Sequence, residues 1–215
     1  EVRGGVVPWQ GGDAQWIPSH RVRMGMARAV GDFDRDGRTE VAIGRLYGED
    51  ANTDGDLRVI QEDGTVEMVP TLRGVRAVGA GDLDGDGKAE LLFGDGWHKN
   101  YGKLARYRPN VATRAANGTW AVTTLDERTD NYAIEQIGIV GRTVVAGGNA
   151  TLGVYEFGGK GWRMLEPRHS VRGTGGFAAL PGGALLLSGE RVSRIQPGAS
   201  VDVPLHEQKQ PKSQE

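Results

Sequence analysis

The sequence feature that most constrains the fold of this chain is an acidic string that occurs twice. GDFDRDGRTEVAIG at residues 31–44 returns fifty positions later as GDLDGDGKAELLFG at residues 81–94. Carboxylates at alternate positions converge only where the chain curls tightly, and a following glycine (Gly37, Gly87) permits that curl. The carboxylates are Asp32, Asp34, Asp36 and Glu40 in the first copy and Asp82, Asp84, Asp86 and Glu90 in the second.

These residues offer oxygen donors without sulfur or imidazole, which indicates a hard cation. Calcium suits such a loop better than magnesium, because magnesium demands a tighter octahedron and retains more of its water. The sequence therefore predicts two Ca2+ sites. The alternative is a metal-free Asp/Gly turn that joins two strands.

An EF-hand loop starts with the same spacing, but its twelfth position requires a bidentate glutamate. Here that position holds Ile43 in the first copy and Phe93 in the second. The segments EVAIG and ELLFG that follow each turn are apolar and typical of strands, not of a helix. The acidic turns are therefore predicted to connect two β-strands.

The repeat continues beyond its acidic copies. Aligning the glycines that close the apolar strands gives VAIG, LLFG, VAGG and LLSG, with steps of 50, 54 and 41 residues. The third copy has Val144 in place of the glutamate, and the fourth turns on Pro181, Gly182 and Gly183. We expect metal in the first two repeats only.

A second family of β-prone hairpins alternates with these turns, near residues 6, 57, 104–125, 153 and 191. Units of four strands, each of 40 to 50 residues and without a helix, are typical of β-propeller blades. We therefore predict an all-β fold with a single propeller domain over residues 1–205 and a disordered tail at 206–215. The expected parts are a partial blade at 1–20 and full blades at 21–70, 71–127, 128–169 and 170–205.

The acidic motifs and strands over roughly residues 21–204 resemble FG-GAP or VCBS repeats, the calcium-bearing propeller blades also seen in the integrin α-subunit headpiece and in some fungal lectins. The resemblance implies that the calcium loop joins the first two strands of a blade. It also implies a main-chain carbonyl ligand from Arg38 in the first loop and from Lys88 in the second. The family usually places aspartate where this chain has Glu40 and Glu90, so the mode of coordination by the longer side chain is left open.

Four full units and a leading hairpin do not close a ring cleanly. We expect either that residues 1–20 complete a blade whose inner strands lie upstream in a longer protein, or that the propeller has five irregular blades. The spacing of Gly147, Gly148, Tyr155 and Trp162 also resembles a kelch blade.

Two loops between predicted inner and outer hairpins are rich in polar and aromatic residues. Aromatic rings beside amides and acids suit sugar recognition, since a pyranose stacks on the ring and hydrogen-bonds to planar polar groups. The alternative is that Trp97 and Tyr101 only fill the gap between blades. A further cation site in the first loop is opposed by Arg58 at its ninth position. The candidate ligand residues are Tyr47, Asp50, Asn52 and Asp54 in the first loop, and Trp97, His98, Asn100 and Tyr101, beside Asp95, in the second.

The composition of the chain excludes several classes of function. The chain has 26 basic and 28 acidic residues, a net charge of −2 and no cysteine. The net charge provides no overall positive potential that would attract nucleic acid, and the absence of cysteine excludes thiolate chemistry. No apolar run approaches the roughly 18 residues of a membrane span. Motifs for a catalytic nucleophile or a phosphate loop are also missing.

We therefore expect a non-catalytic, calcium-binding interaction or adhesion module. Its glycan or protein ligand is expected on the face opposite the calcium loops. The alternative is the propeller portion of a secreted carbohydrate-active enzyme, a lyase or a hydrolase. Calcium sites of moderate affinity fill outside the cytosol, which predicts an extracytoplasmic or secreted location.

Overall fold

The computed structural model describes the chain from the first hairpin to the eighteenth strand, with gaps. The described residues are 5–6, 17–18, 27–45, 57–72, 74–97, 106–127, 134–148, 151–158, 161–170, 174–188, 191–196 and 199–203. Every regular element within them is a β-strand, so the all-β fold class is confirmed. None of the described residues forms a helix long and apolar enough to cross a membrane.

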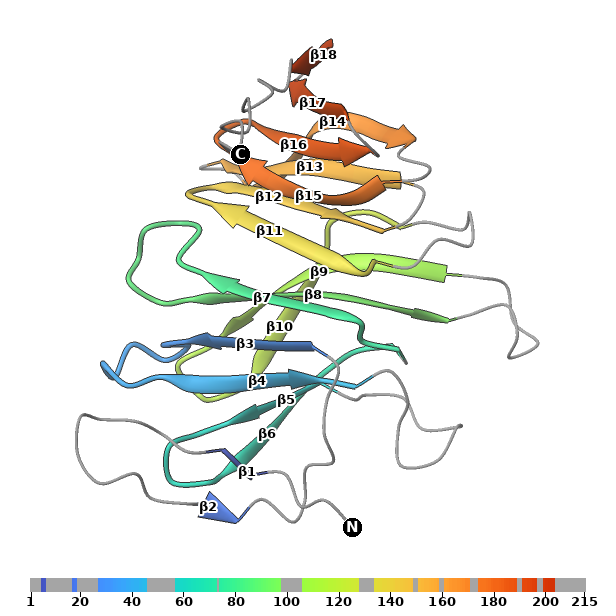
Figure 1. Cartoon of the computed structure of the whole chain (residues 1–215). Coiled ribbons are helices and arrows are strands. Elements are labelled where there is room, and N and C mark those ends of the chain that lie inside the picture. Colours follow the sequence, from blue (N-terminus) through green and yellow to red (C-terminus); the bar gives the residue numbers. More distant parts are fainter. Residues whose placement is uncertain are drawn as a thin grey trace, which may run out of the picture.

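The strands form four sheets, each a simple antiparallel meander of four consecutive strands (Figure 1). The first sheet contains β3 (Ala27–Gly31), β4 (Glu40–Gly44), β5 (Leu57–Ile60) and β6 (Val66–Val69). The second contains β7 (Ala77–Gly81), β8 (Glu90–Trp97), β9 (Arg106–Arg114) and β10 (Trp120–Thr124). These sheets confirm the predicted alternation of two hairpin types.

The third and fourth sheets repeat the plan without the acidic residues. The third contains β11 (Gln136–Val140), β12 (Thr143–Gly147), β13 (Thr151–Gly158) and β14 (Gly161–Ser170). The fourth contains β15 (Thr174–Leu180), β16 (Gly183–Ser188), β17 (Arg191–Gln196) and β18 (Ala199–Val203). Before all four sheets, the short strands β1 (Gly5–Val6) and β2 (Ile17–Pro18) pair antiparallel.

The four sheets follow one another in chain order, and each meets the next along its first strand (Figure 1). Strand β3 packs against β7, β7 against β11, and β11 against β15. Within the described residues this row stays open, with the first and fourth sheets at opposite ends and no closed ring. The sheets are therefore stacked as neighbouring blades would be, while closure into a propeller stays a prediction, as do the predicted domain boundaries.

The core lies between neighbouring sheets. One buried cluster joins the first and second sheets around Phe33, Leu57 and Phe93, and another joins the second and third around Leu92, Tyr107 and Val144. The small residues of the first strands let the sheets approach closely. This packing holds the turn between the first two strands of each sheet at one common end of the stack.

The glycine at the end of the apolar strand is required by that close approach. A Cβ atom on Gly44 would lie 2.4 Å from Cγ1 of Val75, which leads into the second sheet. In the next sheet a Cβ on Gly94 would lie 2.3 Å from Cβ of Ile134, which leads into the third. Gly44 and Gly94 therefore lie where the segment that leads into the next sheet packs against the apolar strand, with no room for a side chain.

One strand differs from expectation. The segment after Gly94 was expected to be a loop, but β8 continues to Trp97 and pairs along that length with β9. The reason is Asp95, which is buried and hydrogen-bonded within the sheet and so keeps the backbone extended. Asp95 is therefore a structural residue, and its proposed place in a ligand loop was wrong.

Candidate metal centre

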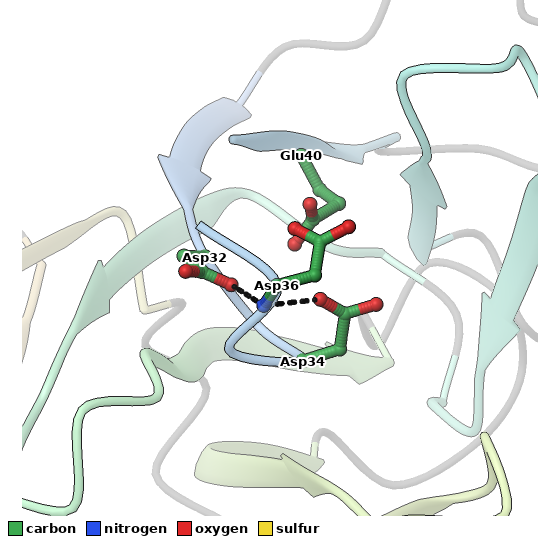
Figure 2. Close-up of side chains that lie close together, drawn as sticks. All are labelled: Asp32, Asp34, Asp36 and Glu40. Carbon is green, nitrogen blue, oxygen red and sulfur yellow. Dashed lines mark hydrogen bonds between the residues drawn. The ribbon is translucent and has the colours of Figure 1, made fainter. Parts of the chain in front are cut away.

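The first acidic loop brings four carboxylates together at the end of the hairpin β3–β4. Oxygen atoms of Asp32, Asp34, Asp36 and Glu40 all lie within 4.8 Å of one another. Figure 2 shows the three aspartates around the curl of the loop, with the glutamate reaching in from the start of β4. A group of this kind can hold a metal ion.

Backbone N–H groups give the first loop its curl. Asp32 accepts from the N–H of Asp36 at 3.2 Å and of Gly37 at 2.9 Å. Asp34 accepts from the same Asp36 N–H at 3.1 Å, and Asp36 accepts from the N–H of Arg38 at 2.8 Å. Gly37 has a φ of 84°, which glycine adopts without strain. The alternating aspartates therefore shape the loop as well as line it.

The second loop repeats this geometry. Asp82 accepts from the N–H groups of Asp86 at 3.1 Å and Gly87 at 3.0 Å, and Asp84 accepts from Asp86 at 3.0 Å. Asp86 accepts from the Lys88 N–H at 2.7 Å. Oxygens of the three aspartates lie within 4.8 Å of one another, but Glu90 does not belong to that closest group.

The two glutamates are the buried members of the loops. Glu40 is 1% exposed and Glu90 is 6% exposed. Each accepts a backbone N–H at 2.7 Å, from Phe33 in the first loop and from Leu83 in the second. Both side chains thus face inward, beneath the aspartates.

Burial raises the pKa of Glu40 and of Glu90 to about 7. The backbone N–H opposes this rise, and the neighbouring aspartates add to it by repulsion. A buried carboxylate with like charges beside it is costly unless a cation neutralises it. The donor set is therefore chemically suited to a hard divalent cation, since it consists of carboxylate oxygens and its buried glutamate is costly to ionise without one.

The resemblance also implied carbonyl ligands from Arg38 and Lys88. Each residue lies two positions after the third aspartate of its loop, beyond the glycine, and its N–H donates to that aspartate. The Arg38 side chain turns away to pair with Glu62 at 2.8 Å. Coordination by their carbonyls stays a prediction.

The candidate ligand residues of the opposite face lie outside the described residues. This applies to Tyr47, Asp50, Asn52 and Asp54, to His98, Asn100 and Tyr101, and to the Trp97 side chain.

A cavity that the sequence did not indicate opens at the opposite end of the inner strands from the acidic loops. It has a volume of about 390 Å³ and lies where β3, β7 and β11 begin. Its polar lining comes from Arg28, Arg76, Glu135 and Gln136, and Phe177 of β15 adds an aromatic ring. These residues come from all four repeats, so no local sequence motif could have predicted the cavity.

The fold and the two loops together define a repeat protein of antiparallel four-stranded sheets with acidic turns. The FG-GAP-like repeat family matches this chain over residues 32–93. The match runs from the first acidic loop to the strand after the second, and it confirms the resemblance to FG-GAP repeats for that segment. A search of curated proteins found no match to the chain.

Proposed function

We propose that this chain is a calcium-stabilised β-propeller module that serves in binding rather than in catalysis. The observation that carries the proposal is the repeated carboxylate loop, in which backbone N–H groups hold three aspartates above a buried glutamate. A cation would neutralise the cluster and fix the connection between the first two strands of a sheet. Calcium fits best, because it accepts several carboxylates with flexible geometry, whereas magnesium does not.

The expected energetic effect of calcium is substantial. If each site had a Kd of about 10 μM and free calcium were about 1 mM, each would add on the order of 2.7 kcal/mol to the free energy of unfolding. Sites of that strength are filled outside the cytosol. FG-GAP repeats usually occur in extracellular domains, which supports the same location. We therefore propose that the protein acts in an extracytoplasmic or secreted setting.

Thermal unfolding in calcium, in magnesium and in chelator tests the metal assignment. Calcium should raise Tm by on the order of 10 °C over the chelated protein, and magnesium by much less. Replacing Asp34→Ala together with Asp84→Ala should abolish the shift, because each substitution removes both a negative charge and an oxygen ligand from its cluster.

Asp63→Ala is the matched control. Asp63 also accepts a backbone N–H, from Thr65 at 2.8 Å, but lies in the turn between β5 and β6, away from both clusters. This variant should keep the full calcium shift. Equal melting of the unmodified protein in calcium and in chelator would overturn the calcium assignment.

For the ligand we propose a glycan or protein bound on the face opposite the calcium loops. The cavity at the start of the inner strands supports this face, because it combines an aromatic ring with guanidinium, carboxylate and amide groups. A glycan array probed with and without calcium tests the proposal. Calcium-dependent retention without turnover supports a binding module, whereas release of products from a polysaccharide supports the alternative of a carbohydrate-active enzyme.

A further inference from the structure

The two acidic loops share a backbone but differ in their surroundings. A guanidinium from the neighbouring sheet reaches the first loop, where Nη1 of Arg114 donates to Oδ2 of Asp34 at 3.1 Å. Arg114 is the last residue of β9 in the second sheet, and its side chain is 17% exposed. A fixed positive charge therefore already lies against one of the carboxylates that would bind the metal.

Glu67 of the first sheet holds Arg114 in that position. The guanidinium forms a bidentate pair with Glu67, in which Nε donates to Oε2 at 3.0 Å and Nη2 donates to Oε1 at 2.7 Å. The side chains of Trp120, at 2.9 Å, and Gln61, at 3.1 Å, also donate to Glu67. Burial would raise the pKa of Glu67, but the bonds from Arg114 and Trp120 hold it below its usual value. Glu67 is thus a charged anchor that aims Arg114 at Asp34.

Among the described residues no arginine donates to a carboxylate of the second loop, although the Arg35 side chain of the first loop lies beside it, where a Cβ on Gly87 would be 3.2 Å from Nε of Arg35. The three aspartates of the second loop are all exposed, and within the described residues the Asp84 carboxylate accepts a hydrogen bond only from the Asp86 N–H. The corresponding places in the next pair of sheets hold Ala121, the second residue of β10, and Gly158, the last residue of β13. Ala121 cannot take the place of Glu67, and Gly158 cannot take the place of Arg114. The sequence therefore cannot form the same ion pair beside the second loop.

Arg114 affects metal binding in two ways. It stabilises the empty first loop by neutralising Asp34, and it repels a divalent cation that enters beside it. Both effects of Arg114 act on the first site, because the acidic-loop carboxylate that Arg114 contacts is Asp34. We propose, on the basis that both loops bind calcium, that Arg114 makes the first site the weaker of the two by about tenfold, an effect that outweighs the fourth carboxylate, Glu40, in the first cluster. The second site then fills first as calcium rises.

Calorimetric titration of the full chain with calcium tests this order. Asp34→Ala isolates the second site, and Asp84→Ala isolates the first. The second site should have the lower Kd by about tenfold. Equal affinities, or a tighter first site, would overturn the inference while leaving the proposed calcium binding intact.

Substitutions at Arg114 and Glu67 should act in opposite directions on the first site. In the Asp84→Ala background, Arg114→Gln should tighten calcium binding about tenfold. Glu67→Gln should weaken it, because Arg114 then has only Asp34 as an ionised partner. A residue with a merely structural role would weaken binding in both variants, so an Arg114→Gln variant that folds and does not bind more tightly counts against the inference.

Arg163→Gln is the matched control, since Arg163 also donates to a glutamate, Glu156, on an outer hairpin but lies in the third sheet. It should leave both affinities unchanged. Circular dichroism of each variant verifies folding, and the comparison of the two isolated sites does not depend on any Arg114 variant. Failure of the unmodified chain to bind calcium at all would instead overturn the proposed function.

Discussion

Glu40 and Glu90 sit at the bottom of the acidic loops, where burial and the surrounding aspartates make ionisation costly. Each has a pKa of about 7 without a metal. A metal ligand must be deprotonated, so below that pH calcium has to displace a proton from each glutamate. With the proposed calcium binding, the burial of Glu40 and Glu90 would therefore link calcium affinity to pH near neutrality.

We predict that calcium affinity falls by up to about tenfold per pH unit as the pH drops below 7. In chelator the measured quantity is the free energy of unfolding, which should fall as the pH rises. Because the folded-state pKa lies above the ordinary value of 4.5, the contribution of each glutamate to stability is fully present below pH 4.5 and is lost as pH rises through about 7. Calorimetry and melting curves between pH 5 and 8 measure both trends. An affinity independent of pH over this range would contradict the prediction.

Asp95 is the most completely satisfied charged residue in the second sheet. It accepts from Nε of Arg108 at 3.0 Å, from Nη2 of Arg108 at 2.7 Å and from Nδ2 of Asn110 at 3.0 Å. It also accepts the N–H of Leu72 at 2.6 Å, from the chain that leads in from the first sheet. The residue thus joins β8, β9 and the incoming connection.

We predict that Asp95→Ala costs about 3 kcal/mol or more of unfolding free energy, because it leaves Arg108 partly buried without its counter-charge. Urea unfolding measures the loss. Glu156→Ala, which breaks the more exposed pair with Arg163, should cost less than about 1 kcal/mol. Similar losses in the two variants would show that the hydrogen bonds of Asp95 contribute no more to stability than an exposed ion pair does.

At the scale of elements, the sheets depend on close contact at the end of their second strands. Gly94 lies in β8 against Ile134, with no room for a side chain. We predict that Gly94→Ala costs about 2 kcal/mol, since the two sheets must separate to admit a methyl group. Gly158→Ala is the control, because a Cβ there would meet only an ordinary contact at 3.6 Å, and it should change stability by less than about 0.5 kcal/mol.

The hairpins themselves could be predicted from the sequence, because turn residues and alternation are local signals. The acidic turns, the recurrent glycines and the outer hairpins all fall where these signals placed them. The continuation of β8 to Trp97 could not be predicted. It depends on Arg108 and Asn110, which reach Asp95 only after β9 has paired with β8.

At the scale of the whole molecule, the first and second sheets are joined through the acidic loops. The Ala89 N–H of the second loop donates to the Asp32 carbonyl of the first at 2.8 Å. Trp120 of the second sheet meets Phe33 of the first loop edge to face, with ring centroids 5.7 Å apart. The third and fourth sheets have the same strands but no acidic loop.

We therefore predict that calcium protects the two halves unequally against hydrogen exchange. Amides of residues 27–45 and 74–97 should exchange more slowly in calcium than in chelator, whereas those of the third and fourth sheets should change little. The Asp34→Ala, Asp84→Ala double variant should lose the difference. Uniform protection along the chain would instead indicate that calcium stabilises all four sheets as one cooperative unit.

The sequence alone determined the repeat, the all-β fold class and the carboxylates that meet in each turn, because all three depend on residues a few positions apart. Only the tertiary structure distinguished the two loops. Arg114 is 80 residues from Asp34 and 47 from Glu67 in the chain, and the three meet only when the second sheet packs on the first. The cavity formed by the starts of several inner strands has the same origin. Such contacts leave no local pattern, because the packing of separate sheets creates them.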